Sequence, residues 1–134
     1  MATKVSLLDG AHAIIEQRYS GDCTVRDYYQ TYNDTYHLSE QFGDPQVVIV
    51  NLTACTTVPI GTLANAVYEH AKRASAQMMI LVGANRFLRE IIDIVDAITP
   101  DAPRNVFYAR HLSEAHDIIA EQQYIPLSTL YAAG

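Results

Sequence analysis

The sequence has little that would cross-link the chain, bind a metal or enter a membrane. Its 134 residues include two cysteines, Cys23 and Cys55, which form no CxxC pair and have no histidines at metal-ligand spacing. We therefore expect two reduced thiols and no metal. No apolar run approaches the ~20 residues that cross a bilayer, and the first ten residues lack the apolar segment of a signal peptide. These absences predict a cytoplasmic protein without a membrane span.

Positive charge is also scarce. Nine Lys and Arg residues stand against fifteen Asp and Glu residues, which gives a net charge of -6. A phosphate backbone or an anionic membrane would be repelled at long range by such a chain. We expect no nucleic-acid partner.

Catalytic motifs are missing as well. The sequence contains no HExxH, no GxSxG elbow, no GxGxxG loop and no GK[ST] phosphate loop. The five histidines are scattered over different parts of the chain: His12, His37, His70, His111 and His116. We expect no enzyme and no cofactor, and an enzyme without a recognisable motif stays as an alternative.

The composition is that of one compact domain. The chain is 49% hydrophobic and 18% charged, which is too apolar for a disordered segment. Residues 1–124 carry a regular alternation of apolar runs and are predicted to form a single domain. Residues 125–134 fall outside this alternation and form an apolar tail.

The first apolar runs predict a β-hairpin followed by a helix. Residues 5–8 and 11–19 are separated by Asp9 and Gly10, which favour a two-residue type I′ turn. Thr24 and Asp27 have the spacing of a capping box and predict a helix start. Residues 43–45, Gly-Asp-Pro, should end this helix.

The remaining chain alternates strands with helices. Two continuous apolar runs, 47–50 and 78–82, are typical of strands buried on both faces. Helices are predicted after them, with Pro59 in the first turn of one and Asn85 capping the next, which Pro100 and Pro103 should end. A short strand at 105–109 and a helix capped by Ser113 follow. The order β-β-α-β-α-β-α-β-α predicts an α/β fold with a mixed five-stranded sheet.

Over roughly residues 4–123 this pattern resembles the STAS (sulfate transporter and anti-sigma factor antagonist) domain family. The resemblance is carried by the strand VVIVNLT, a helix with Gly61 in its first turn, the strand MMILV, and residues 83–85 and 112–115 at two helix starts. It implies a STAS-like fold and a non-catalytic regulatory or signalling module. Its partner would be a protein, such as a regulatory kinase or an anti-sigma-like factor.

One position departs from the family pattern. The helix after the strand at 47–52 commonly opens with Asp-Ser-Ser-Gly, whose serine a partner kinase phosphorylates, whereas residues 58–61 here read Val-Pro-Ile-Gly. No hydroxyl is present to accept phosphate there. Thr56, Thr57 and Thr62 are the nearby hydroxyls that could substitute for it, although threonine beside a helix start is also a common cap.

Two surface sites follow from these observations. The resemblance places partner binding on residues 53–65, and the residues expected to carry it are Thr56, Thr57, Pro59, Ile60, Gly61 and Thr62. A second, anion-binding site is suggested by the helix start at Gly83, Asn85, Arg86 and Arg89, where backbone N–H groups and guanidinium groups would meet an acidic group. A tight turn with an ordinary helix cap explains the same residues. A small-ligand module, holding a lipid or a nucleotide, is the alternative function.

Tyrosine is concentrated in the first helix. Four of the nine tyrosines lie between Tyr28 and Tyr36, and with Val25 they recur at three- and four-residue spacing. Their rings either pack inward against the sheet or remain exposed as an interface, for which tyrosine is well suited. These rings and the apolar tail, with Leu127, Leu130 and Tyr131, also predict a homodimer.

Overall fold

The computed structural model describes residues 3–72, 78–83, 85–98, 105–123 and 126–130. Its elements are β1 (Thr3–Asp9), β2 (Ile14–Asp22), α1 (Val25–Phe42), β3 (Val47–Thr57), α2 (Ile60–Lys72), β4 (Met78–Gly83), α3 (Asn85–Ile98), β5 (Val106–Ala109), α4 (Leu112–Gln123) and the 3₁₀ turn η1 (Leu127–Thr129). The predicted α/β class and element order are confirmed.

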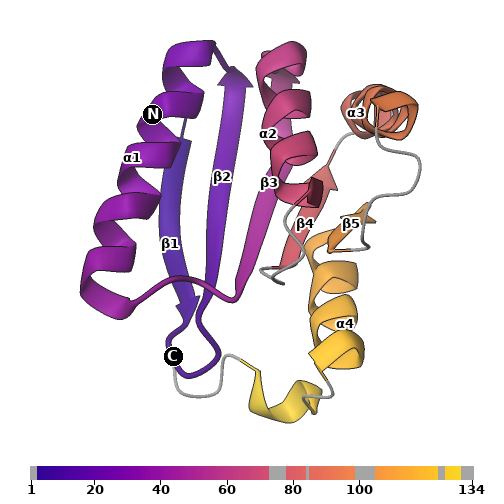
Figure 1. Cartoon of the computed structure of the whole chain (residues 1–134). Helices are drawn as coiled ribbons and strands as arrows, with labels where there is room; N and C mark the ends of the chain where they lie inside the picture. The colour runs from indigo at the N-terminus through magenta and orange to yellow at the C-terminus, as the bar shows by residue number, and fades with distance from the viewer. Residues whose placement is uncertain (1–2, 73–77, 84, 99–104, 124–125, 131–134) are drawn as a thin grey trace.

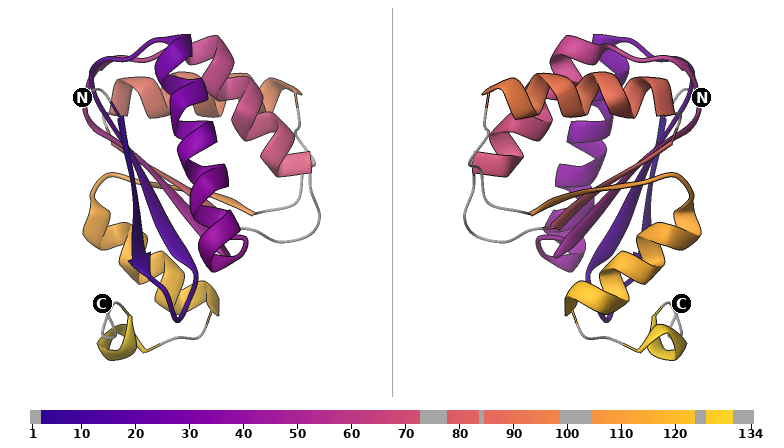
Figure 2. Two further views of the ribbon diagram at one scale, coloured as in Figure 1. Left: turned by 90° about the vertical axis from the view of Figure 1, so that its left-hand side faces the viewer. Right: turned by 90° about the vertical axis from the view of Figure 1, so that its right-hand side faces the viewer.

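The five strands form one mixed sheet in the order β1-β2-β3-β4-β5 (Figure 1). β1 pairs antiparallel with β2, and the other pairs are parallel, as predicted. From β2 to β5, each strand lies on the same side of the strand before it. Right-handed crossovers between these parallel strands therefore place α1, α2 and α3 on the same face of the sheet. The side views in Figure 2 show α4 on the opposite face.

Each face of the sheet has its own apolar core. Strand residues such as Val48, Val50 and Leu81 pack under α2 and α3 with Val67 and Ile91. On the other face the core is formed with α4 by Ile14, Val47, Ile49, Met78, Ile80, Val82, Ala109, Ala115, Ile119 and Leu130. Every residue from Val47 to Val50 is buried, which agrees with the prediction of a central strand covered on both sides.

The hairpin turn differs from the prediction. β2 begins at Ile14, so residues 10–13 form the connection, and a two-residue turn at Asp9 and Gly10 is wrong. The residue with positive φ is Ala13, at 52°, rather than Gly10. The buried Asp9 carboxylate accepts hydrogen bonds from the backbone N–H of His12, at 3.0 Å, and lies 2.8 Å from the His12 ring. This side chain closes the longer turn.

The predicted capping box at the start of α1 is confirmed. Thr24 Oγ1 accepts a hydrogen bond from the Asp27 N–H at 3.2 Å, and the Asp27 carboxylate accepts one from the Thr24 N–H at 2.9 Å. Two orphan donors of the helix terminus are thereby satisfied.

The other predicted helix starts differ from the structure by one or two positions. Pro59 precedes α2, where its carbonyl accepts from the Leu63 N–H at 2.9 Å. Asn85 is the first residue of α3 rather than its cap, and Ser113 lies inside the first turn of α4. The His111 carbonyl instead accepts the first bond of α4, from the Glu114 N–H at 3.1 Å. Pro100 and Pro103 lie outside the described residues.

The apolar tail is described in part. Leu130 is buried in the core beneath α4, whereas Leu127 is 55% exposed. Tyr124, Ile125 and Tyr131 lie outside the described residues. Among the helices that the structure describes, none is long and apolar enough to cross a membrane.

Candidate functional site

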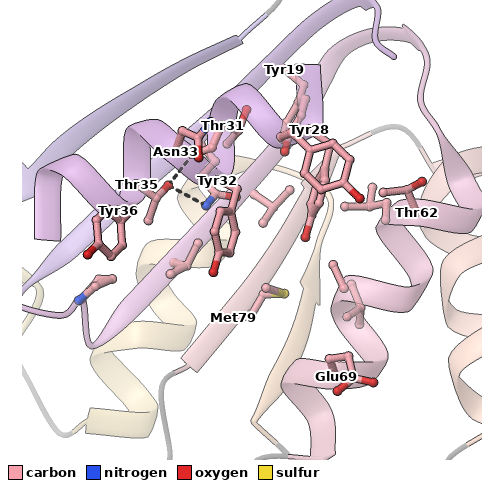
Figure 3. Close-up of a pocket in the computed structure, with 18 of the residues that line it drawn as sticks. Tyr19, Tyr28, Thr31, Tyr32, Asn33, Thr35, Tyr36, Thr62, Glu69 and Met79 are labelled. Carbon is pink, nitrogen blue, oxygen red and sulfur yellow. Dashed lines mark hydrogen bonds between the residues drawn. The ribbon is translucent and has the colours of Figure 1, made fainter. Parts of the chain in front are cut away.

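A large groove lies between α1 and α2. It has a volume of about 620 Å³, and its floor is formed by Val48 and Val50 of β3 and Met79 of β4. Figure 3 shows tyrosines of α1 along one wall and Thr62 and Glu69 of α2 along the other. We call this feature the tyrosine groove. It is lined by Gln17, Tyr19, Tyr28, Tyr29, Thr31, Tyr32, Asn33, Thr35, Tyr36, Ser39, Asp44, Pro45, Val48, Val50, Thr62, Leu63, Asn65, Ala66, Val67, Glu69 and Met79.

Three tyrosines of α1 stand out into solvent at the groove. Tyr29, Tyr32 and Tyr36 are 58%, 62% and 60% exposed. An exposed aromatic ring leaves apolar area in water, and three of them on successive turns form a patch that a partner could cover. Of the two interpretations of the tyrosine series, the structure therefore favours exposed rings for these three, while Tyr28 is half-buried.

A row of hydroxyl side chains explains why α1 turns these rings outward. The Thr31, Thr35 and Ser39 hydroxyls donate to the carbonyls of Asp27, Thr31 and Thr35 at 3.0, 2.8 and 2.9 Å. Because these hydroxyls are satisfied within the helix, their small side chains can face the sheet at little cost. Thr31 is only 1% exposed.

At its inner end the groove is lined by two polar residues of β2, Gln17 and Tyr19. Gln17 donates from Nε2 to Thr35 Oγ1 at 3.0 Å, which ties the sheet to α1. The Tyr19 ring is buried, and this burial raises the pKa of its phenol because the charged form would lose water. Tyr28 and Tyr29 meet edge to face, 5.5 Å between ring centroids. This end of the groove thus offers neutral hydroxyls and aromatic rings.

The residues predicted to bind a partner are spread over two elements and the link between them. Thr56 and Thr57 belong to β3, which extends to Thr57 and replaces the expected loop. Their hydroxyls donate to Asp22 Oδ1 at 2.6 and 3.0 Å. These two bonds lower the pKa of the Asp22 carboxyl, and the bond from Thr56 has the larger effect. Of the predicted set, Thr62 lines the tyrosine groove. The other three lie at the start of α2, where Pro59 and Ile60 are half-buried and Gly61 is exposed.

Of the four residues predicted to bind an anion, two line one pocket and two have other contacts. Asn85 and Arg89 line a shallow pocket of about 350 Å³, next to Arg110. Arg86 instead donates to the Thr56 carbonyl at 3.0 Å, and its guanidinium carbon lies 4.6 Å from the centroid of the Phe87 ring. Gly83 is buried in the sheet.

The two thiols lie together at the start of α1 but are poor nucleophiles. Cys23 Sγ and Cys55 Sγ are 3.9 Å apart. Burial raises the pKa of both thiols, that of Cys55 to about 12. At neutral pH little thiolate, the reactive form, is present. In the described part of the chain, no group of three or more Cys, His, Asp or Glu residues could hold a metal ion.

A buried carboxylate on the opposite face of the sheet is held by its neighbours. Glu16, 4% exposed, accepts from Asn51 Nδ2 at 2.8 Å and pairs with Arg18 at 3.1 Å. Asn51 Oδ1 accepts from the Thr53 backbone N–H and hydroxyl at 3.1 and 2.7 Å. An amide at position 51 can donate to Glu16, whereas an aspartate there would repel it. We interpret this cluster as structural.

Comparison with known proteins gives no family or relative from which a role of the groove could be inferred. No protein-family model matches the chain, and no curated protein matches it in sequence.

Proposed function

We propose that this chain is a non-catalytic protein-binding module whose docking surface is the tyrosine groove. The observation that carries the proposal is the exposure of Tyr29, Tyr32 and Tyr36 beside a groove with an apolar floor. Tyrosine is enriched among residues that dominate binding energy, because its ring buries large area at a small entropic cost. Thr62 extends this surface to the start of α2, where the sequence predicted binding.

We further propose that the module is of the STAS type and acts in regulation. The support is the element order, the antiparallel edge strand β1 and the local motifs quoted above. A partner of the regulatory-kinase or anti-sigma kind rests on the same resemblance. Binding would not need a phosphate switch: residues 58–61 lack a hydroxyl, and a phosphate on Thr56 or Thr57 would face the Asp22 carboxylate.

Photo-crosslinking from the groove tests the proposal. With benzoylphenylalanine at position 32, we expect illumination in the cells of origin to give a discrete adduct with a second protein, identified by mass spectrometry. The matched control carries the same probe in place of Ile98, which is 53% exposed on α3 outside the groove, and should not give that adduct. Tyr29→Ala with Tyr36→Ala should weaken the adduct from position 32 without lowering the melting temperature, because both rings are exposed.

Two results would contradict this function. One is the same set of adducts from positions 32 and 98, which would mean random collision. The other is a small molecule retained in the groove and detected by native mass spectrometry of protein purified from its own cells. The volume of about 620 Å³ lies within the usual range for small-molecule sites, so this measurement separates the two functions.

The homodimer stays a prediction with its own test. Leu127 in the tail is exposed, and an exposed apolar side chain beyond the needs of the core can fill a contact between two copies. Removing residues 125–134 should shift the particle from dimer to monomer mass in analytical ultracentrifugation and leave unfolding cooperative. Leu130→Ala is the control, because Leu130 packs on its own core and should affect stability rather than mass. A full-length chain that is monomeric at high concentration would contradict the dimer.

A further inference from the structure

The charge of the tyrosine groove is one-sided. Among the described residues that line it, Asp44 and Glu69 carry carboxylates, and no lysine, arginine or histidine is present. The whole chain adds to this field, since its net charge is -6. A groove with acidic groups in an acidic molecule attracts cations and discourages anions from entering.

The exposed rings favour the same sign of charge. The face of an aromatic ring carries negative quadrupole density and attracts ammonium and guanidinium groups within about 6 Å of its centroid. Tyr29, Tyr32 and Tyr36 are each more than half exposed, so a large part of each ring is accessible to such a group. Tyrosine rings with carboxylates beside them therefore suit the side chains of lysine and arginine, whose stems are apolar and whose ends are charged.

The length of the groove favours a chain over a small cation. Its wall on α1 runs from Tyr28 to Ser39, which corresponds to roughly 16 Å at 1.5 Å per helical residue. An extended segment of about five residues spans that distance. A single small cation would cover only part of the exposed tyrosine patch.

We propose that the tyrosine groove binds a basic segment of its partner protein, with lysine or arginine side chains against the tyrosine rings and near Asp44 and Glu69. This inference rests on the proposed function and adds the chemistry of the partner. The apolar floor formed by Val48, Val50 and Met79 takes the apolar side chains of the same segment.

Synthetic peptides test the sign of the charge. Three labelled amphipathic peptides of one length carry leucine with either lysine, glutamine or glutamate, and their binding to the full chain is measured by fluorescence anisotropy at low and high salt. We expect the lysine peptide to bind at least about tenfold more tightly than the glutamate peptide, with an advantage that shrinks as salt rises. The glutamine peptide should fall between them.

Charge-reversal variants place the effect in the groove. Glu69→Lys and Asp44→Lys should each weaken the lysine peptide several-fold. Glu90→Lys makes the same change in net charge on the exposed side of α3, outside the groove, and should alter binding less than about twofold. Tyr32→Leu keeps apolar area but removes the ring and should weaken the lysine peptide more than the glutamine peptide. Circular dichroism confirms that each variant is folded.

The outcomes separate this inference from the proposed function. If the three peptides bind equally well and a groove variant binds all of them more weakly, the inference of a basic partner is overturned. The groove would then still be a docking surface. An equal loss of affinity for the lysine peptide in Glu90→Lys and Glu69→Lys also overturns the inference, because the net charge of the protein rather than the groove would then determine the affinity. No binding by any peptide overturns it as well, and the adduct at position 32 then decides by itself whether the groove is a docking surface.

Discussion

Gly83→Ala is expected to destabilise this protein strongly. A Cβ at position 83 would lie 2.6 Å from the Leu52 carbonyl carbon and 2.7 Å from Leu52 Cβ, closer than real Cβ atoms approach. Leu52 is fully buried and pairs with Gly83 across β3 and β4, so neither backbone can move away. The φ of Gly83 is also 151°, which an L side chain rarely adopts. Overpacking and backbone strain each cost about 1–3 kcal/mol.

Chemical denaturation measures this loss, and Gly61→Ala is its matched control. A Cβ on Gly61 meets no heavy atom within 4 Å, and this glycine is exposed in the first turn of α2. Alanine there should be neutral or stabilise the protein by up to about 1 kcal/mol, because alanine is the better helix former. If both variants unfold at the wild-type midpoint, the close contact between β3 and β4 is wrong.

Ile49→Asp is expected to abolish cooperative folding at neutral pH. Ile49 is completely buried in the central strand and pairs with Ile80 on one side and Glu16 on the other. An aspartate there would lose its water and stand beside a carboxylate that already needs Asn51 and Arg18. Burying such a charge costs several kcal/mol, which is a large part of a total stability of about 5–15 kcal/mol.

The control for this variant keeps the shape of the core. Ile49→Val removes one methylene and should cost only about 0.5–1.5 kcal/mol. Thermal unfolding followed by circular dichroism distinguishes a lowered but cooperative transition from the loss of any transition. A soluble Ile49→Asp protein that melts like wild type would show that position 49 is not in the core.

Tyrosines and hydroxyl residues of α1 show where sequence interpretation reaches its limit. Tyr28, Tyr32 and Tyr36 recur every four residues, and so do Thr31, Thr35 and Ser39. Each row alone satisfies the helical period, so periodicity cannot tell which one faces the sheet. The answer depends on how closely the helix approaches the strands, and small side chains with internally bonded hydroxyls allow the closer approach.

The tyrosine groove is lined by residues that lie far apart in the sequence. Gln17, Glu69 and Met79 were not predicted to line a binding surface. Gln17 lies two positions from both Ile15 and Tyr19, which are buried, and therefore shares their face of the sheet. Thr62 was expected at a binding surface, but as part of the α2 start rather than as a wall opposite α1.

The sequence alone predicts the strands, their succession along the chain and the class of fold. Continuous β-branched runs can be buried only in the middle of a sheet, and the helices between them leave parallel crossovers as the solution. The tertiary structure decided which face of α1 is exposed, why position 83 excludes a side chain, and where the groove lies. Those features are set by distances between segments that no local pattern records, because packing against a distant neighbour selects among faces of similar hydrophobicity.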